Sequence, residues 1–298
     1  TVCIGGTATL LTSSGGLLTN ISAISENFNA ATNSWVKTNN STGGTPANAA
    51  WTLRPNGYIY DALTFSSNDA SQFYLSNSAD QGSGSTTNTL LQSPAFSLAG
   101  YTTANLSFWH YYRYLGGEEA VVEVSTDGGT WNALAGGTYT SNQGTSNGFV
   151  NANLNMDAYA GEPIVYIRFR FSNATFAYYW AVDNINVTGN IKTVVTWTQN
   201  PVGPNSMFTD ASASIPYSAG TDAASIYVQP GVNTTYTATV SGPAPSNCSK
   251  TATAIFTVTP AVSVRSQRVK IRHALHQRRG APGAGPGGPD PQSAGAAT

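Results

Sequence analysis

The side chains that can carry acid–base chemistry are few and poorly placed for it. Residues 1–263 contain one histidine, His110, which lies inside the apolar stretch ANLSFWHYY. Glu118 and Glu119 are adjacent, so on a strand they point to opposite faces and cannot work as an acid and base pair. The DGG motif is a turn that is too short for a phosphate-binding loop. With no nucleophile motif and no histidine cluster for a metal, the sequence predicts a protein that is not an enzyme.

The stretch YYWAVDNINV at Tyr178–Val187 places three aromatic side chains beside a single acid, Asp183. Its second half alternates through Ile185 and Val187, which predicts a strand. We interpret this stretch as the closing strand of a β-sandwich.

The aromatic residues in and before this stretch allow two interpretations. Exposed and coplanar rings would form a platform on which a sugar can stack, whereas buried rings would belong to the core, where aromatics dominate sandwich interiors. The candidates for ligand binding are Trp109, Tyr111, Tyr178 and Trp180, with Tyr112, Tyr114 and Tyr179 beside them.

The composition is typical of a β-rich extracellular module. Charged residues make up only 9% of the 298 residues, against about 25% in a typical soluble domain, and Ser, Thr, Asn and Gly solvate the chain instead. Residues 1–263 carry seven basic and thirteen acidic side chains, which argues against nucleic acid as a partner. No apolar run reaches the roughly 18 residues that a membrane span needs, so we expect no membrane span.

The chain consists of many short apolar stretches separated by Gly and Asn turns, without sustained helical periodicity. In VYIRFRF, at 165–171, Ile167 and its alternate neighbours face inward, while Arg168 and Arg170 face outward. This pattern predicts an all-β protein built on an antiparallel jelly-roll β-sandwich. The strands between 192 and 260 have the size of an immunoglobulin-like sandwich that lacks its first strands.

The domain organisation follows from two incomplete pieces. The strand at 1–12 has no nearby partner, and joining it to the later strands completes both pieces. We therefore predict a discontinuous immunoglobulin-like domain of residues 1–19 and 191–260, with an inserted jelly-roll domain of residues 20–190. Residues 261–298, basic and then Gly/Pro-rich, predict a disordered tail. Its arginines also allow binding to nucleic acid or an anionic surface, although the abrupt change in composition favours a disordered or out-of-frame end.

The joined pieces resemble the immunoglobulin-like repeats of large surface proteins of the Bacteroidetes type. The matching elements are Cys3-Ile4-Gly5, Leu10, Trp197, Pro230 before Thr235-Tyr236, and Cys248. Two cysteines in a chain of extracellular composition favour pairing, so we expect a Cys3–Cys248 disulfide across the insertion, the alternative being two free thiols. Because the chain begins within a strand, we expect it to be a piece of a longer polypeptide.

The inserted unit resembles the jelly-roll modules related to MAM domains and to the cleaved adhesins of secreted bacterial proteins. The matching pieces, in order, are Glu26-Asn27-Phe28 before Trp35, Leu91-Gln92-Ser93-Pro94, Leu106-Ser107-Phe108-Trp109, the run from Val122 to Trp131, Ala160-Gly161 before Ile167-Arg168-Phe169, and the run from Trp180 to Ile185. Members commonly have Asp-Asp where this chain has Asp183-Asn184, which removes one carboxylate.

This second resemblance implies a structural Ca²⁺ near the first and last strands, with Glu26 and Asp183 as the best matches. Because Ca²⁺ takes six to eight oxygen ligands, Asp61, Asp69 and Glu119 are further candidates, although no motif places them. The alternative is that Glu26 and Asp183 are hydrogen-bonded residues at strand ends that hold no metal.

Together these features predict a non-catalytic adhesion or interaction module of a larger secreted or cell-surface bacterial protein. Its partners would be an extracellular protein or glycan and the neighbouring domains of the same polypeptide. The alternative function is a carbohydrate-binding accessory module of a secreted hydrolase or protease.

Overall fold

The computed structural model describes residues 2–3, 6–242 and 248–259, and the predicted tail at 261–298 lies outside this part. The all-β prediction is confirmed, because the described residues form mostly antiparallel sheets with very little helix. The short helical segments are α1 (Pro46–Ala49), α2 (Ser78–Gln81) and the 3-10 turn η1 (Asp157–Tyr159).

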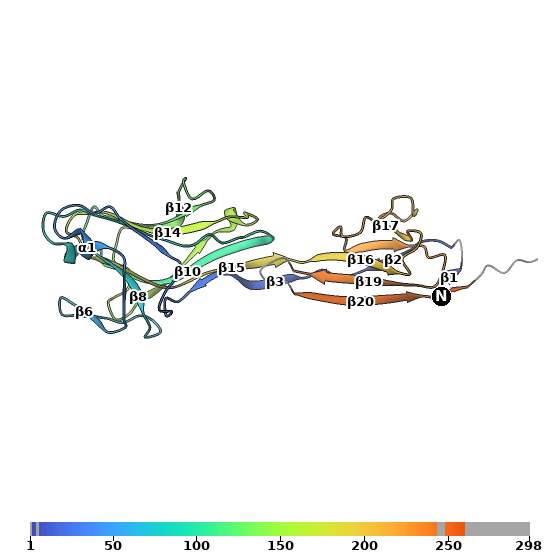
Figure 1. Cartoon of the computed structure of the whole chain (residues 1–298), viewed down its shortest axis with the longest axis horizontal. Helices are drawn as coiled ribbons and strands as arrows, with labels where there is room; N and C mark the ends of the chain where they lie inside the picture. Colours follow the sequence, from blue (N-terminus) through green and yellow to red (C-terminus); the bar gives the residue numbers. More distant parts are fainter. Residues whose placement is uncertain (1, 4–5, 243–247, 260–298) are drawn as a thin grey trace, which may run out of the picture. The chain divides into compact units, whose positions relative to one another are not determined.

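A six-stranded antiparallel sheet contains the predicted closing strand near its centre. Its order is β13-β10-β15-β8-β5, and β3 pairs with the second half of β15 (Figure 1). The strands are β13 (Val150–Asn155), β10 (Tyr101–Tyr112), β15 (Tyr179–Lys192), β8 (Phe73–Asn77), β5 (Thr52–Arg54) and β3 (Leu17–Glu26).

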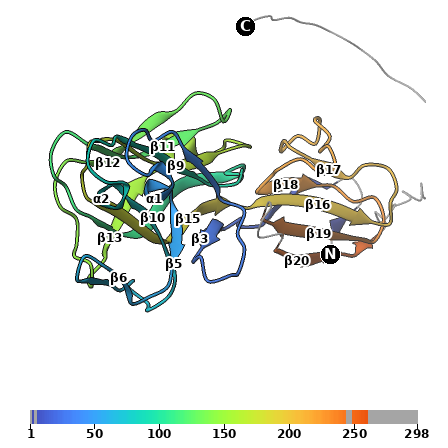
Figure 2. The same cartoon turned by 60° about the vertical axis from the view of Figure 1, so that its left-hand side comes forward.

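A five-stranded antiparallel sheet forms the second layer. Its order is β12-β11-β14-β9-β4, and Figure 2 shows β11 and β9 in one layer with β13 and β5 in the other. The strands are β12 (Asn132–Tyr139), β11 (Glu119–Ser125), β14 (Tyr166–Ala174), β9 (Thr87–Gln92) and β4 (Val36–Asn39).

The core lies between these two sheets and follows from strand alternation. Ile167, Phe169 and Phe171 of β14 are wholly buried, as the alternation of VYIRFRF predicts. Trp180 of β15 packs against Phe169 with ring centroids 5.6 Å apart. Each large apolar side chain buried in this way contributes about 1.5–3 kcal/mol to the free energy of unfolding.

The opposite face of the six-stranded sheet is also buried. The hairpin of β6 (Tyr58–Tyr60) and β7 (Leu63–Phe65) contributes to a second apolar cluster. The buried members of this cluster are Phe65, Phe73, Leu75, Tyr111, Phe149, Tyr179 and Ala181. Since neighbours on a strand point to opposite faces, Tyr179 belongs to this second cluster while Trp180 belongs to the core between the sheets.

The remaining strands form two small sheets around a separate core. One has the order β16-β19-β20 and the other β17-β18-β2, and Figure 2 shows β17 and β18 on one side with β19 and β20 on the other. Their strands are β16 (Val194–Asn200), β19 (Thr234–Ser241), β20 (Ser249–Phe256), β17 (Met207–Phe208), β18 (Ser225–Val228) and β2 (Thr9–Thr12).

The start of the chain pairs with strands that come more than 200 residues later. β2 is antiparallel to β18, and β1 (Val2–Cys3) is parallel to β21 (Val258–Thr259). The core of these sheets includes Trp197 and Tyr236, with Leu11 of β2 packed against it. The domain boundaries at 19/20 and 190/191 stay a prediction, although β3 begins already at Leu17 and pairs along β15 as far as Lys192.

Candidate functional site

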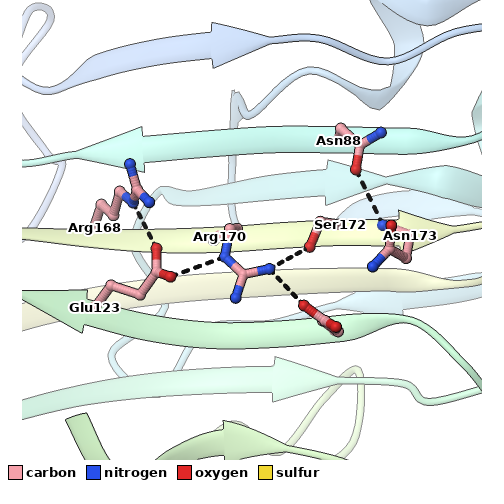
Figure 3. Close-up of polar contacts among 7 residues, drawn as sticks. Asn88, Glu123, Arg168, Arg170, Ser172 and Asn173 are labelled. Carbon is pink, nitrogen blue, oxygen red and sulfur yellow. Dashed lines mark hydrogen bonds and ion pairs between the residues drawn. The ribbon is translucent and has the colours of Figure 1, made fainter. Parts of the chain in front are cut away.

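Four charged side chains gather on the outer face of the five-stranded sheet (Figure 3). The inward residues of β14 leave Arg168 and Arg170 on the outer face, and the antiparallel register places Glu123 of β11 directly opposite Arg168. Glu123 accepts hydrogen bonds from both arginines, at 2.6 Å from Arg168 Nε and 3.0 Å from Arg170 Nε. Arg170 Nη1 also donates to Glu119 at 2.6 Å, which completes a four-residue network.

This network, hereafter the charged network, is partly withdrawn from solvent. The Glu123 side chain is only 9% exposed, and the Arg168 guanidinium lies over the ring of Trp131, 4.1 Å from its centroid. The hydrogen bond from Arg170 holds the pKa of Glu119 below its usual value. Desolvating ion pairs costs free energy, and this chain carries few charges, so their concentration here makes this surface a candidate site.

A groove of about 220 Å³ runs beside the charged network. Half-buried Leu90 of β9 gives it an apolar surface, and Ser172 Oγ accepts a hydrogen bond from Arg170 Nη1 at 2.6 Å. Asn88 Oδ1 accepts from the main-chain N–H of Asn173 at 3.1 Å (Figure 3). The residues that line the groove are Asn40, Asn88, Thr89, Leu90, Arg168, Arg170 and Ser172.

Several polar atoms of this groove have no protein partner. Within the described part of the chain, Arg170 Nη2, Asn88 Nδ2 and the side-chain amide of Asn40 make no hydrogen bond. The groove therefore combines a small apolar surface, supplied by Leu90, with free donors held on a sheet.

Asp69 and Asp183 meet on the other sheet, where the loop after β7 passes over β15. Asp183 is wholly buried, and its Oδ1 accepts from the main-chain N–H of Asn184 at 2.7 Å. Asn184 Nδ2 donates to Asp69 Oδ2 at 3.0 Å. Ser71 Oγ donates to Asp69 Oδ1 at 2.5 Å and lies 3.4 Å from Asp183 Oδ2, so Ser71 and Asn184 both lie between the two acids.

A local irregularity of β15 brings Asp183 to this position. Val182 and Ile185 both point into the core, and between them the register with β10 shifts and Asn184 takes a positive φ of 49°. Asp183 and Asn184 therefore both lie between the inward-facing Val182 and Ile185, where regular alternation would place one residue. An extra residue of this kind is a β-bulge.

The electrostatics of this acid pair suit a cation. Burial is the main cause that raises the pKa of Asp183 to about 7; the negative charge of Asp69 acts in the same direction, and the hydrogen bond from the main-chain N–H of Asn184 opposes it. A divalent cation would compensate both charges, and carboxylate and amide oxygens are ligands that Ca²⁺ takes. The described residues hold no group of three or more His, Cys, Asp or Glu placed for a metal, so main-chain or amide oxygens would have to complete the site.

The other three predicted calcium ligands lie elsewhere. Glu26 accepts a hydrogen bond from the main-chain N–H of Phe28 at 2.7 Å, and its register partner is Ile185 rather than Asp183. Asp61 lies exposed in the turn between β6 and β7. Glu119 belongs to the charged network on the five-stranded sheet. Asp69 therefore lies beside Asp183, whereas Asp61 and Glu119 lie away from it.

Two of the four candidate rings for a sugar platform are buried, as the alternative interpretation of core aromatics expects. Trp180 is wholly buried in the core between the sheets, and Tyr111 is 7% exposed in the cluster on the opposite face, because the two alternate on paired strands. Trp109 and Tyr178 are half-buried at the edge of that second cluster, and Tyr178 carries the Arg113 guanidinium 3.8 Å from its ring centroid. The aromatic ring beside the charged network is Trp131, which the sequence analysis named only as the end of the run from Val122 to Trp131.

His110 and Glu118, the other residues considered for acid–base chemistry, have structural roles. His110 is buried, its Nδ1 accepts from Trp180 Nε1 at 3.3 Å, and burial lowers its pKa to about 4. Glu118 accepts hydrogen bonds from the main-chain N–H groups of Leu115 and Gly116, which fixes the loop after β10.

The predicted Cys3–Cys248 disulfide is absent. Cys248 is a free, exposed thiol that immediately precedes β20. Cys3 pairs in register with Thr259, beyond the other end of the same strand. A strand of eight residues spans about 26 Å, whereas a disulfide needs Cα atoms within about 7 Å.

Comparison with known proteins identifies no family for this chain. No family profile matches the sequence, and no curated protein matches it. In the described residues, no helix has both the length and the apolar character needed to cross a membrane.

Similar solved structures include adhesin and carbohydrate-binding domains. The K1 and K3 cleaved adhesin domains of Lys-gingipain from Porphyromonas gingivalis W83 are 18% and 16% identical, with TM-scores of 0.40 and 0.39. These matches cover 56% and 57% of this chain, and 97% and 100% of those domains. TmCBM61 in complex with β-1,4-galactotriose is 9% identical over 52% of this chain and 88% of that one, with a TM-score of 0.32. Likeness at this level carries no argument about function.

Proposed function

We propose that this chain is a non-catalytic binding module of a larger secreted or cell-surface protein, and that it works in adhesion. The charged network on the outer face of the five-stranded sheet is its binding surface. The observation that carries the proposal is the gathering of Arg168 and Arg170, two of only seven basic residues in 1–263, beside a groove with free donors.

The character of the surface supports binding rather than catalysis. Arginine and tryptophan are the residues most often found at binding hot spots, and Arg168 stacked on Trp131 presents both. The two acids of the charged network are each bonded to arginine, so neither is free to take a proton from a substrate. An extracellular location agrees with the sparse charge of the whole chain.

A structural Ca²⁺ is a further part of the proposal. Asp69 and Asp183 would hold it, and the ion would supply positive charge beside the buried Asp183 and the exposed Asp69. In that role it fixes the loop after β7 against β15, and it takes no part in binding at the charged network, which lies on the other sheet.

Binding of the labelled chain to immobilised matrix proteins and to an oligosaccharide array tests the binding function. Trp131→Ala and Arg170→Lys should each weaken binding to the probe that wild type recognises by at least about tenfold, the loss expected for one interface anchor. Tyr227→Ala, which changes a half-buried aromatic residue of β18, is the matched control and should bind as wild type. Unchanged binding in both Trp131→Ala and Arg170→Lys would refute the assignment of this surface.

A further inference from the structure

The groove beside the charged network has a composition that narrows the class of ligand, on the assumption that this surface is the binding site proposed above. We propose that the groove binds a sugar ring of an uncharged glycan.

The charges around the groove are already balanced. The Nε atoms of Arg168 and Arg170 both donate to Glu123. Arg170 Nη1 donates to Glu119 and to Ser172. An anionic ligand would meet two arginines neutralised by two glutamates and would come close to those glutamates. The site therefore offers a directional donor in Arg170 Nη2 without offering net positive charge, which favours a neutral ligand.

A sugar ring matches the remaining chemistry of the groove. Leu90 supplies an apolar surface for the C–H face of a ring, while Arg170 Nη2, Asn88 Nδ2 and the Asn40 amide lie unpaired around it. Sugar hydroxyls both donate and accept, so they can satisfy arginine donors and the mixed amide groups together. A volume of about 220 Å³ on an open face suits one ring with the rest of a glycan extending into solvent.

The groove is held in place before any ligand arrives. Arg170 is fixed by three hydrogen bonds, and Asn88 Oδ1 is fixed by the main-chain N–H of Asn173. Groups that are already ordered cost less conformational entropy on binding. Weakly binding neutral ligands, which gain little from charge, benefit most from this preorganisation.

A peptide strand is disfavoured as the occupant. An extended peptide usually adds to a free sheet edge, where main-chain groups are unpaired. The groove lies over β9, which pairs with β14 on one side and β4 on the other, so its main-chain groups are already used.

The test is an array of neutral gluco-, galacto- and manno-oligosaccharides beside the same chains carrying a uronic or sialic acid, probed with the whole chain. We expect wild type to bind at least one neutral series. Asn40→Ala and Leu90→Gln should each weaken that binding at least fivefold, and neither disturbs the charged network. Thr198→Ala, at an exposed position of β16, is the control and should leave binding unchanged.

The outcomes separate this inference from the proposed function. Binding restricted to acidic glycans, or to matrix protein alone, and lost in Arg170→Lys would overturn the neutral-glycan inference and leave the binding surface standing. Neutral-glycan binding that persists in Asn40→Ala and Leu90→Gln would also overturn it. Binding of any probe that is insensitive to Trp131→Ala, Arg170→Lys and both groove variants would overturn the inference and the function together.

Discussion

The outer faces of the two large sheets differ in what covers them. The six-stranded sheet is closed by a second apolar cluster that includes Phe65 of the β6–β7 hairpin and Tyr179 of β15. The outer face of the five-stranded sheet carries the charged network and a groove, and none of the three apolar clusters of the described residues lies on it. Aromatic content alone therefore does not locate a binding surface, because most aromatic rings here pack against other rings.

The largest expected effect is on the covered face. Phe65→Ala removes a wholly buried ring that lies 5.1 Å from the Tyr179 ring centroid, and we expect it to lower the free energy of unfolding by about 4 kcal/mol. Leu90→Ala, on the open face, should cost less than about 1 kcal/mol because Leu90 is already half exposed. Urea unfolding measures both changes in the free energy of unfolding. Equal losses would contradict the difference in burial between the two faces.

The interior between the sheets should tolerate charge far less than the open face does. Burial lowers the folded-state pKa of His110 to about 4, below its unfolded value near 6.5, so the folded protein binds this proton more weakly. The stability that neutral His110 provides is therefore present above pH 6.5 and is lost as the pH falls towards 4, by about 3 kcal/mol.

His110→Gln should flatten this part of the profile of unfolding free energy against pH, because glutamine does not titrate. Acidic groups contribute to the wild-type profile in the same range, so the difference between the two profiles is the informative quantity. Parallel profiles between pH 4 and 6.5 would contradict the assigned role of His110.

The covered face of the six-stranded sheet holds a pair of acids, Asp69 and Asp183, and calcium binding would act there. If Ca²⁺ binds Asp69 and Asp183, then Ca²⁺ at about 100 times its dissociation constant should add about 2.7 kcal/mol of stability and raise the melting temperature. Thermal melts at neutral pH with Ca²⁺ and with chelator measure the shift, and Asp69→Asn should reduce it. No shift with millimolar Ca²⁺ would count against the site, and the same shift in Glu119→Gln would confirm that the charged network is separate.

The smallest effect concerns the charged network itself. Glu123→Gln removes the carboxylate that two arginines share, and we expect a loss of about 2 kcal/mol because the Glu123 side chain is mostly buried. Glu119→Gln, at a side chain that is 47% exposed, should cost less than about 1 kcal/mol. Denaturant midpoints distinguish the two, and equal effects would show that burial does not set the strength of these pairs.

Strand alternation predicted the β14 pattern from sequence, including the outward position of Arg168 and Arg170. It could not predict that Glu123 lies opposite Arg168, because the register between β11 and β14 depends on the packing of both strands. The same limitation explains why the sequence could not tell exposed aromatic rings from buried ones. Tyr111 and Trp180 lie on neighbouring strands and yet point to opposite faces of the sheet.

Segments rich in Ser, Thr and Asn were the hardest to interpret. Residues 38–84 are rich in these polar types, yet β8 within them is buried along its whole length. The loop residue Asp69 of this stretch reaches Asp183 only because the chain folds back over β15, and no local pattern carries that information. The Cys3–Cys248 pairing failed for a related reason, since matching composition says nothing about which end of a strand a cysteine occupies.

The parallel pairing of β1 with β21 bears on how the chain would respond to mechanical force. A pull that draws residue 2 and residue 259 in opposite directions loads parallel neighbours in shear, so the hydrogen bonds between them resist together instead of opening one after another. As long as that pairing holds, tension passes from one end to the other across it and does not enter the intervening residues. A binding surface on β9, β11 and β14 would keep its shape while the polypeptide that carries it is stretched.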